Sequence, residues 1–255
     1  MSRSSLAGRV ALITGAAQGM GAAHARRLAA DGALVAVNDR VPSAQLDAVA
    51  AEVGGLAFPA DVSDPLAVEA LVGAVHERCG SLDVLVANHA YMSMAPFLEH
   101  DPGDWWKVVD TNLGGTFHLV RAAVPLMRTA GGGRIIVITS EWGVTGWPEA
   151  TAYAASKAGL IALVKTLGRE LAPEGITVNG IAPGVIDTPQ LLVDAQSAGV
   201  PLEEIKTMYA AGIPVARIGE PSEISAVVSL LADFRLNAMI GQTVQVNGGT
   251  TRSRV

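Results

Sequence analysis

Short runs of apolar residues, many of them β-branched, recur along the chain and are separated by longer stretches with helical spacing of apolar positions. The runs do not alternate polar with apolar residues, which is typical of strands buried on both faces of a parallel sheet. We expect strands at 9–14, 34–39, 82–88, 134–139, 176–182 and 243–246, and a weaker one at 56–59. We expect helices at about 20–31, 43–53, 65–79, 103–129, 150–172 and 221–232.

Strands that alternate with helices predict right-handed crossovers between parallel strands. We therefore predict an α/β fold of the Rossmann type: a doubly wound, mainly parallel seven-stranded sheet with helices on both faces. No repeat, linker or change of composition marks a boundary, so residues 1–255 are expected to form a single domain. A proline-containing stretch at about 184–219 breaks the pattern, and we expect a mobile helical flap over the site there.

Composition narrows the class of protein. The formal net charge is −6 and Lys and Arg form no run, so nucleic acid and anionic membranes are not expected partners. The single Cys79 excludes an internal disulfide and suits a reducing compartment. The first apolar run is too short for a signal peptide and no segment is long enough to span a bilayer, so we expect a cytoplasmic protein. The five His residues lack ligand-like spacing, and no metal site is predicted.

A glycine-rich turn, TGAAQGMG at 14–21, joins the first strand to the first helix. Gly15 permits a tight turn, while Gly19 and Gly21 let the backbone approach a pyrophosphate at a helix N-terminus, where free N–H groups favour anions. Alone, such a turn is also compatible with a plain strand-to-helix connection. Its position between a buried strand and a helix favours a nucleotide site.

Asp39, at the end of the second strand, indicates which dinucleotide binds. A carboxylate there can accept hydrogen bonds from both adenosine-ribose hydroxyls and repels a 2′-phosphate, which favours NAD over NADP. Arg40 favours the opposite choice, since a guanidinium can pair with that phosphate. None of the variable loop positions is basic: Ala16, Ala17, Gln18 and Met20. We therefore predict NAD as the cofactor.

Three proton-transfer groups form the second motif. Tyr153 and Lys157 would lie one turn apart on a helix, and Ser140 stands at the strand edge where doubly wound sheets bind ligands. A bare Tyr-x-x-x-Lys is more often the surface of an amphipathic helix. An ammonium about 5 Å from the phenol, at an effective dielectric near 20, contributes about 3 kcal/mol and would lower a tyrosine pKa from about 10 to about 8. Tyr153 would then exchange a proton with an alcohol or ketone, while Ser140 hydrogen-bonds the same oxygen.

Together these motifs resemble the short-chain dehydrogenase/reductase family over nearly the whole chain. TGAAQGMG is similar to the family's cofactor loop, SEWG (140–143) to its Ser-x-x-Gly, YAASK (153–157) to its Tyr-x-x-x-Lys and PGVIDT (183–188) to its nicotinamide turn. The resemblance implies an NAD(P)-dependent oxidoreductase with the catalytic residues Asn112, Ser140, Tyr153 and Lys157. It further implies that Asn112 holds a water of a proton relay and that Lys157 also binds the nicotinamide ribose.

The loop, the strand ends and the resemblance give one set of cofactor-binding positions. They are Gly15, Gln18, Gly19, Met20, Gly21, Asp39, Arg40, Asp61, Val62, Asn88, Tyr153, Lys157, Pro183, Gly184, Ile186 and Thr188. Asp61 either hydrogen-bonds the adenine amino group or caps the following helix. Two segments depart from the family pattern: after the fourth strand His89 replaces an Ala and Ala90 replaces a Gly, and near the C-terminus Asn247 replaces an Asp. His89 either makes a structural hydrogen bond or contacts cofactor or substrate.

The substrate pocket is expected above the nicotinamide. Its candidate residues are Tyr91, Glu141, Trp142, Trp147, Gln190 and Leu191. The two Trp residues either form pocket walls or pack the helix entry against the core. Glu141 is either a solvated loop carboxylate or faces the pocket, where it would favour a substrate with a hydroxyl or an amine. An apolar, aromatic-lined pocket favours a cyclic or aryl secondary alcohol and its ketone.

The sequence thus predicts an NAD-dependent oxidoreductase that interconverts a secondary alcohol and its ketone, with Tyr153 as acid and base. Two alternatives stay open: an NADPH-dependent ketoreductase of a biosynthetic pathway, with Arg40 as phosphate ligand, and an NAD-binding regulatory protein without turnover. The resemblance also implies a homotetramer built through the helices at 103–129 and 150–172 and the last strand. At most one of Trp105 and Trp106 can face the core, so the other is available to a neighbouring subunit.

Overall fold

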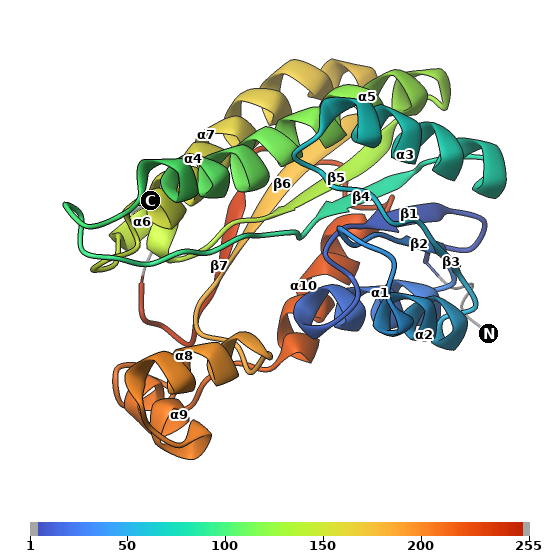
Figure 1. The fold of residues 1–255 in the computed structure, drawn as a ribbon. Coiled ribbons are helices and arrows are strands. Elements are labelled where there is room, and N and C mark those ends of the chain that lie inside the picture. Colours follow the sequence, from blue (N-terminus) through green and yellow to red (C-terminus); the bar gives the residue numbers. More distant parts are fainter. Residues whose placement is uncertain (1–4, 252–255) are drawn as a thin grey trace.

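Seven parallel strands form one sheet in the computed structural model, which describes residues 5–251 (Figure 1). The strands are β1 (Val10–Ile13), β2 (Leu34–Val37), β3 (Leu56–Ala57), β4 (Val84–Ala87), β5 (Gly133–Ile138), β6 (Ile176–Pro183) and β7 (Thr243–Val246). Their order in the sheet is β3-β2-β1-β4-β5-β6-β7, so the chain reverses its direction of winding between β3 and β4. The predicted doubly wound Rossmann-type fold is confirmed.

Helices cover both faces of the sheet (Figure 1). On one face lie α3 (Pro65–Cys79), α5 (Gly115–Thr129) and α7 (Thr151–Leu171), and on the other α1 (Gly19–Ala30), α2 (Ala44–Glu52) and α10 (Pro221–Ala232). Successive strand side chains point to opposite faces, so Ile135 and Val137 of β5 belong to the first apolar layer and Ile136 to the second. Between residues 5 and 251, no helix has the length and apolar character needed to cross a membrane.

The predicted helix at 103–129 is interrupted. α4 (Pro102–Val109) passes into a π-helical turn, η1 (Asp110–Gly114), before α5 begins. Such turns are rare and occur often at functional sites. This one carries the buried Asn112, whose side chain bonds to neighbouring segments instead of its own helix. The prediction of one continuous helix was wrong, because apolar periodicity does not reveal the local widening of a single turn.

The stretch predicted as a flap contains two short helices, α8 (Gln190–Ala198) and α9 (Leu202–Ala211). They pack against each other beyond the C-terminal end of β6, outside the two helical layers (Figure 1). Pro189 and Pro201 stand at the two helix starts, where the missing backbone N–H has no helical partner to lose. A parallel β-bridge between Ile186 and Gly219 joins the two ends of the segment.

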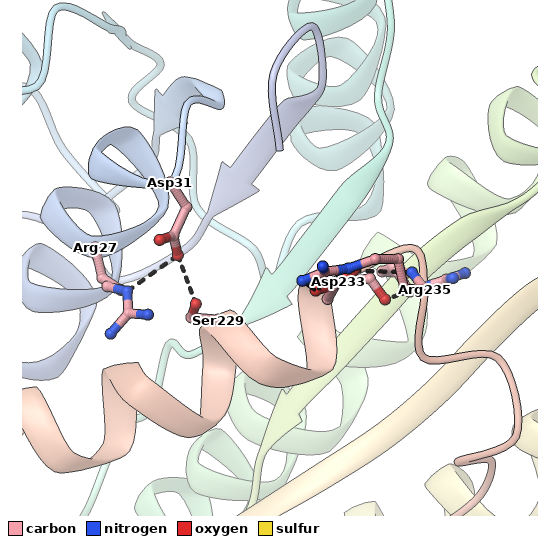
Figure 2. A network of polar contacts seen from close by, with 6 residues as sticks. Arg27, Asp31, Ser229, Asp233 and Arg235 are labelled. Carbon is pink, nitrogen blue, oxygen red and sulfur yellow. Dashed lines mark hydrogen bonds and ion pairs between the residues drawn. The ribbon is translucent and has the colours of Figure 1, made fainter. Parts of the chain in front are cut away.

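A polar network holds α10 against α1 (Figure 2). The Asp31 carboxylate accepts hydrogen bonds from the Ser229 hydroxyl at 2.5 Å and from the Arg27 guanidinium at 3.0 Å. Just beyond the end of α10, Asp233 pairs with Arg235. Because α10 leads into β7, these contacts help to fix where the last strand joins the sheet.

Candidate active site

A cavity of about 560 Å³ lies over the C-terminal ends of β1, β2 and β4, a volume typical of ligand-binding clefts. Most of the predicted cofactor-binding residues line it: Gly15, Gln18, Gly19, Met20, Gly21, Asp39, Arg40, Asp61, Val62, Asn88 and Thr188. Three segments far apart in the sequence, namely the glycine loop, the end of the second strand and the loop after the fourth, therefore meet in one place. Lys157 and Pro183 do not line this cavity.

The glycine loop has a backbone that only glycine supports at its central positions. Gly15 adopts φ +62°, and a Cβ on it would lie 2.9 Å from the Cα atom of His89. A Cβ on Gly21 would lie 2.1 Å from the Gly15 carbonyl oxygen, so α1 packs directly on the turn. The N-cap Gln18 makes no side-chain cap hydrogen bond and the first turn of α1 has no acidic residue. These features fit the pyrophosphate of a dinucleotide, which would accept hydrogen bonds from the first N–H groups of α1.

The Asp39 carboxylate lies at the wall of this cavity, two residues beyond the end of β2. Its oxygens accept hydrogen bonds from the backbone N–H groups of Ala17, at 3.1 Å, and Arg40, at 2.8 Å. The carboxylate is thus anchored to the glycine loop, with its negative charge at the place where an adenosine ribose would lie in this fold.

Asp61 lines the cavity from the loop after β3. Its Oδ1 accepts hydrogen bonds from the backbone N–H and the hydroxyl of Ser63, at 2.9 and 2.7 Å. The helix that follows, α3, is capped by Asp64, which accepts from the backbone N–H of Leu66. The alternative in which Asp61 caps this helix is therefore wrong.

Ser140, Tyr153 and Lys157 come together at the same edge of the sheet. Ser140 lies two residues beyond β5, while Tyr153 and Lys157 occupy consecutive turns of α7. Ser140 Oγ accepts a hydrogen bond from the backbone N–H of Trp142 at 3.2 Å and lies beside the Tyr153 phenol. Lys157 is only 1% exposed; its Nζ donates to the Ile138 carbonyl at 2.8 Å and lies 5.4 Å from the centre of the Tyr153 ring. The spacing of the motif thus brings hydroxyl, phenol and amine into one cluster.

Burial dominates the titration of this cluster. It raises the pKa of Tyr153 to about 12, opposed in part by the hydrogen bond from Ser140, and it lowers the pKa of Lys157 to about 7. Both groups favour their neutral forms because a charge loses its hydration in the interior. The expected lowering of the Tyr153 pKa is therefore not found in the protein alone. Near neutral pH the phenol keeps its proton, which is the state that can donate to a ketone.

Asn112 connects the loop after β4 to α7. Its Oδ1 accepts from the backbone N–H of Tyr91 at 2.7 Å, and its Nδ2 donates to the Tyr91 carbonyl at 3.0 Å and to the Ser156 hydroxyl at 3.1 Å. Both ends of the amide are engaged, and Ser156 directly precedes Lys157. The side chain therefore braces the cluster, a contribution that sequence reasoning missed.

His89 makes structural hydrogen bonds, which was the first of the two alternatives for this residue. It also lines the cofactor cavity. Its Nδ1 lies 2.8 Å from the Thr14 hydroxyl and its Nε2 3.1 Å from the Thr111 carbonyl oxygen. A carbonyl can only accept, so Nε2 carries the proton and Nδ1 accepts from Thr14. The neutral ring thus links the end of β1 to the π-helical turn. Burial, aided by Lys157, lowers the pKa of His89 to about 3.

This burial predicts a dependence of stability on pH. The His89 imidazole binds a proton near pH 6.5 in the unfolded chain and only near pH 3 in the folded one, so acidification favours unfolding. Between pH 8 and pH 5 the folded state should lose about 2 kcal/mol through this residue. In urea unfolding, His89→Ala should therefore flatten the fall in unfolding free energy by about that amount. His24 allows an independent check of the same effect. Burial lowers its pKa to about 4, so His24→Ala should also flatten the fall in unfolding free energy. An unchanged pH dependence in both variants would contradict the prediction.

A second cavity, of about 230 Å³, adjoins the first, and the two share the lining residues Met20, Ala90, Thr188 and Gln190. Ser140 and Tyr153 lie in its wall. Four predicted substrate-binding residues also line it: Glu141, Trp142, Gln190 and Leu191. The turn positions Gly184, Ile186 and Thr188 complete this part of the wall. The reacting groups are thus accessible from a pocket next to the cofactor cavity.

Two other predicted substrate positions lie elsewhere. Tyr91 lines the cofactor cavity and donates its hydroxyl to Asp104 at 2.8 Å, so the structure does not support a contact with substrate. Trp147 is 45% exposed and stacks on Trp142, with ring centroids 4.9 Å apart and planes 7° from parallel. Trp142, the first residue of the short helix α6 (Trp142–Thr145), meets the Tyr153 ring edge to face at 5.8 Å. Trp142 is therefore the pocket wall, and Trp147 supports it from outside.

The flap supplies pocket residues that sequence reasoning missed. The Tyr209 hydroxyl, from α9, donates to Asp194 at 3.2 Å, and Gln190 Nε2 donates to the other Asp194 oxygen at 3.0 Å. All three line the second cavity. The four-residue spacing of Gln190 and Asp194 was a signal for this pair. Nothing local to the sequence indicated that Tyr209 would face the same pocket.

Comparisons with known proteins agree with this geometry. The family model described as "Enoyl-(Acyl carrier protein) reductase" matches residues 15–251. The 3-oxoacyl-[acyl-carrier-protein] reductase of Staphylococcus aureus is 38% identical, over 94% of this chain and 96% of that protein. A short-chain dehydrogenase/reductase of Armillaria gallica is 39% identical over 95% of each chain. The crystal structure of levodione reductase matches with a TM-score of 0.91 and 34% identity, covering 96% of this chain and 98% of the other. This chain therefore belongs to the short-chain dehydrogenase/reductase family and is an NAD(P)-dependent oxidoreductase.

Proposed function

We propose that this oxidoreductase interconverts a secondary alcohol and its ketone with NAD as the preferred cofactor. The observation that carries the proposal is the position of Ser140 and Tyr153 in the wall of a small cavity that adjoins the larger, glycine-lined one. A ligand carbon in the small cavity would lie next to the end of a dinucleotide in the large one. The apolar walls, among them Met92, Trp142 and Leu191, support a compact hydrophobic substrate.

The chain's own groups would handle the proton. A bound nicotinamide supplies the acceptor or donor of hydride. Tyr153, protonated near neutral pH, would donate its proton to the ketone oxygen in reduction and take it back in oxidation. Ser140, in the same cavity wall as Tyr153, would donate to the same substrate oxygen and stabilise the charge that develops on it. Lys157, when protonated, would favour the phenolate and so assist oxidation. Asn112 would hold α7 and the loop after β4 in fixed positions around these groups.

NAD is proposed over NADP because of the fixed Asp39 carboxylate. Two unit charges about 5 Å apart repel by about 3 kcal/mol at an effective dielectric near 20, roughly a hundredfold in affinity. Asp39 is held by two backbone N–H groups and cannot turn away from a 2′-phosphate without losing them.

We predict that the wild type prefers NAD over NADP by about a hundredfold in kcat/KM, and that Asp39→Ala reduces this preference at least tenfold. Steady-state kinetics with each cofactor measures both ratios. Arg40→Ala is the matched control, because its removal should not weaken the preference for NAD. A wild type that prefers NADP would overturn this choice of cofactor.

A second candidate is an NADPH-dependent ketoreductase that acts in biosynthesis. Two observations favour it. The Arg40 side chain lines the same cavity as Asp39, where a guanidinium could pair with a 2′-phosphate. In addition, relatives at 38% and 39% identity are named 3-oxoacyl-[acyl-carrier-protein] reductases. Reduction of a 3-oxoacyl thioester with NADPH, measured beside oxidation of simple secondary alcohols with NAD, distinguishes the two.

We also propose that the chain forms a homotetramer. Trp106 and Phe117, on α4 and α5, are 58% and 47% exposed, whereas the neighbouring Trp105 is partly buried and donates its indole N–H to Thr151. Large exposed apolar side chains on adjacent helices are typical of a subunit interface. Light scattering of the purified protein decides between four subunits and two.

A further inference from the structure

Glu141 is a buried carboxyl group beside the reacting hydroxyls. It directly follows Ser140, is 5% exposed and lines the same cavity as Ser140 and Tyr153. Its backbone is fixed by the start of α6, because the carbonyl accepts hydrogen bonds from the N–H groups of Val144 and Thr145. The side chain therefore has a defined position in the pocket wall and is not the solvated loop carboxylate that one alternative described.

One oxygen of this carboxyl group lacks a partner. Several buried side-chain nitrogen and oxygen atoms within residues 5–251 have no hydrogen-bond partner. Of these, the one that belongs to a residue lining this cavity is Glu141 Oε2. By contrast, Ser140 Oγ accepts from the backbone N–H of Trp142, and Asp194 accepts from Gln190 and Tyr209. Leaving a buried carboxyl oxygen unpaired costs about 1–3 kcal/mol, so turning the carboxyl group until this oxygen meets a hydrogen-bonding ligand group in the cavity would relieve that cost.

Asn247 and Gly184 make room for this arrangement. A Cβ on Gly184 would lie 2.8 Å from the Asn247 Cβ and 3.4 Å from Glu141 Oε1, so a larger residue would crowd both side chains. Burial raises the pKa of Glu141, and the neighbouring Asn247 side chain opposes part of that rise. An Asp at position 247, which the family pattern would supply, would instead place a second carboxylate against Glu141. The two unusual residues are therefore compatible as a pair.

We propose that Glu141 hydrogen-bonds a second hydroxyl group of the substrate, so that the preferred substrates are cyclic secondary alcohols with another hydroxyl near the reacting carbon, and the corresponding hydroxyketones. This proposal rests on the proposed function. A hydroxyl satisfies Oε2 in either state of the carboxyl group, because it donates to a carboxylate and accepts from a neutral acid. An ammonium would require the ionised form, which burial disfavours. Met20, Val185 and Ile186, elsewhere in the wall, are apolar and suit a ring.

The test compares cyclohexanol with cis- and trans-cyclohexane-1,2-diol as substrates for NAD reduction. Wild type should oxidise at least one diol with a kcat/KM about tenfold or more above that for cyclohexanol, the effect of one well-placed hydrogen bond. Glu141→Leu should reduce this ratio to about one, mainly through a higher KM for the diol, and Glu141→Gln should keep part of it. Glu69→Leu is the matched control: it makes the same change at an exposed glutamate of α3 that lines neither cavity, and it should leave the ratio high.

Each outcome bears on the proposal. A wild-type ratio of one or less, or a Glu141→Leu ratio equal to that of wild type, overturns the role of Glu141 and leaves the proposed function intact. The absence of turnover with both alcohols, in a protein that binds NADH, overturns both. If Glu141→Leu does not fold, the isosteric Glu141→Gln decides through its ratio, which must fall below that of wild type.

Discussion

Replacing Tyr153 by Phe is expected to lower kcat by about a thousandfold, whether alcohol oxidation or ketone reduction is measured. The substitution removes only the phenolic oxygen of a residue that lies beside Ser140 in the wall of the substrate cavity. That oxygen is the group proposed to exchange a proton with the substrate. Because hydride transfer to a ketone leaves an alkoxide unless a proton arrives, the loss should appear in kcat more than in KM.

The Phe ring should keep the packing of the site. Its edge-to-face contact with Trp142, now at 5.8 Å, does not involve the hydroxyl. NADH binding, followed by cofactor fluorescence, should therefore stay within about threefold of wild type, which separates a catalytic loss from a folding defect. If Tyr153→Phe retains a tenth or more of wild-type activity, another group supplies the proton and the assignment is wrong.

Gly21→Ala is expected to have the largest effect on stability and cofactor binding. The added methyl group would lie 2.1 Å from the Gly15 carbonyl oxygen and 2.8 Å from Ala16 Cα. Both are backbone atoms of the glycine loop, which cannot swing aside as a side chain could. We expect a loss of about 3 kcal/mol in unfolding free energy, at the upper end of the range for overpacking. Cofactor affinity should fall as well, because α1 and the turn must separate.

Gly73→Ala is the matched control for this prediction. Gly73 lies within α3, and a Cβ on it would meet nothing within 4 Å. The same change of residue should therefore stabilise the protein by up to about 1 kcal/mol, because alanine favours the helix. Urea unfolding measures both variants. Equal effects in the two would show that the glycine loop is not closely packed against α1.

The sequence was sufficient for the fold and for the location of the reacting groups. The apolar runs that form β1, β4 and β5 are fully buried in the structure. Strands buried on both faces have almost continuously apolar sequences, and this pattern allowed them to be predicted. Ser140 and Tyr153 were also accessible to sequence reasoning, because a strand end and the start of a helix fix them by local rules.

Features that depend on non-local contacts were not accessible. The π-helical turn at Asn112 exists because its amide bonds to Tyr91 and Ser156, which lie far away in the sequence. The pKa of Tyr153 depends on how deeply the folded chain buries it, and the estimate from a single charge neglected that burial. Likewise, Tyr209 reaches the pocket only because α9 packs on α8.

The most direct test of the central claim follows the hydrogen itself. Cyclohexanol, cyclohexane-1,2-diol and 1-phenylethanol, each carrying deuterium on the carbinol carbon, are incubated with the purified protein and NAD. Mass spectrometry then locates the label. One deuterium per ketone formed should appear in the reduced cofactor, and Tyr153→Phe should abolish the transfer. Reduced cofactor without the label, or no labelled cofactor from any of these alcohols although NADH binds, would contradict the claim.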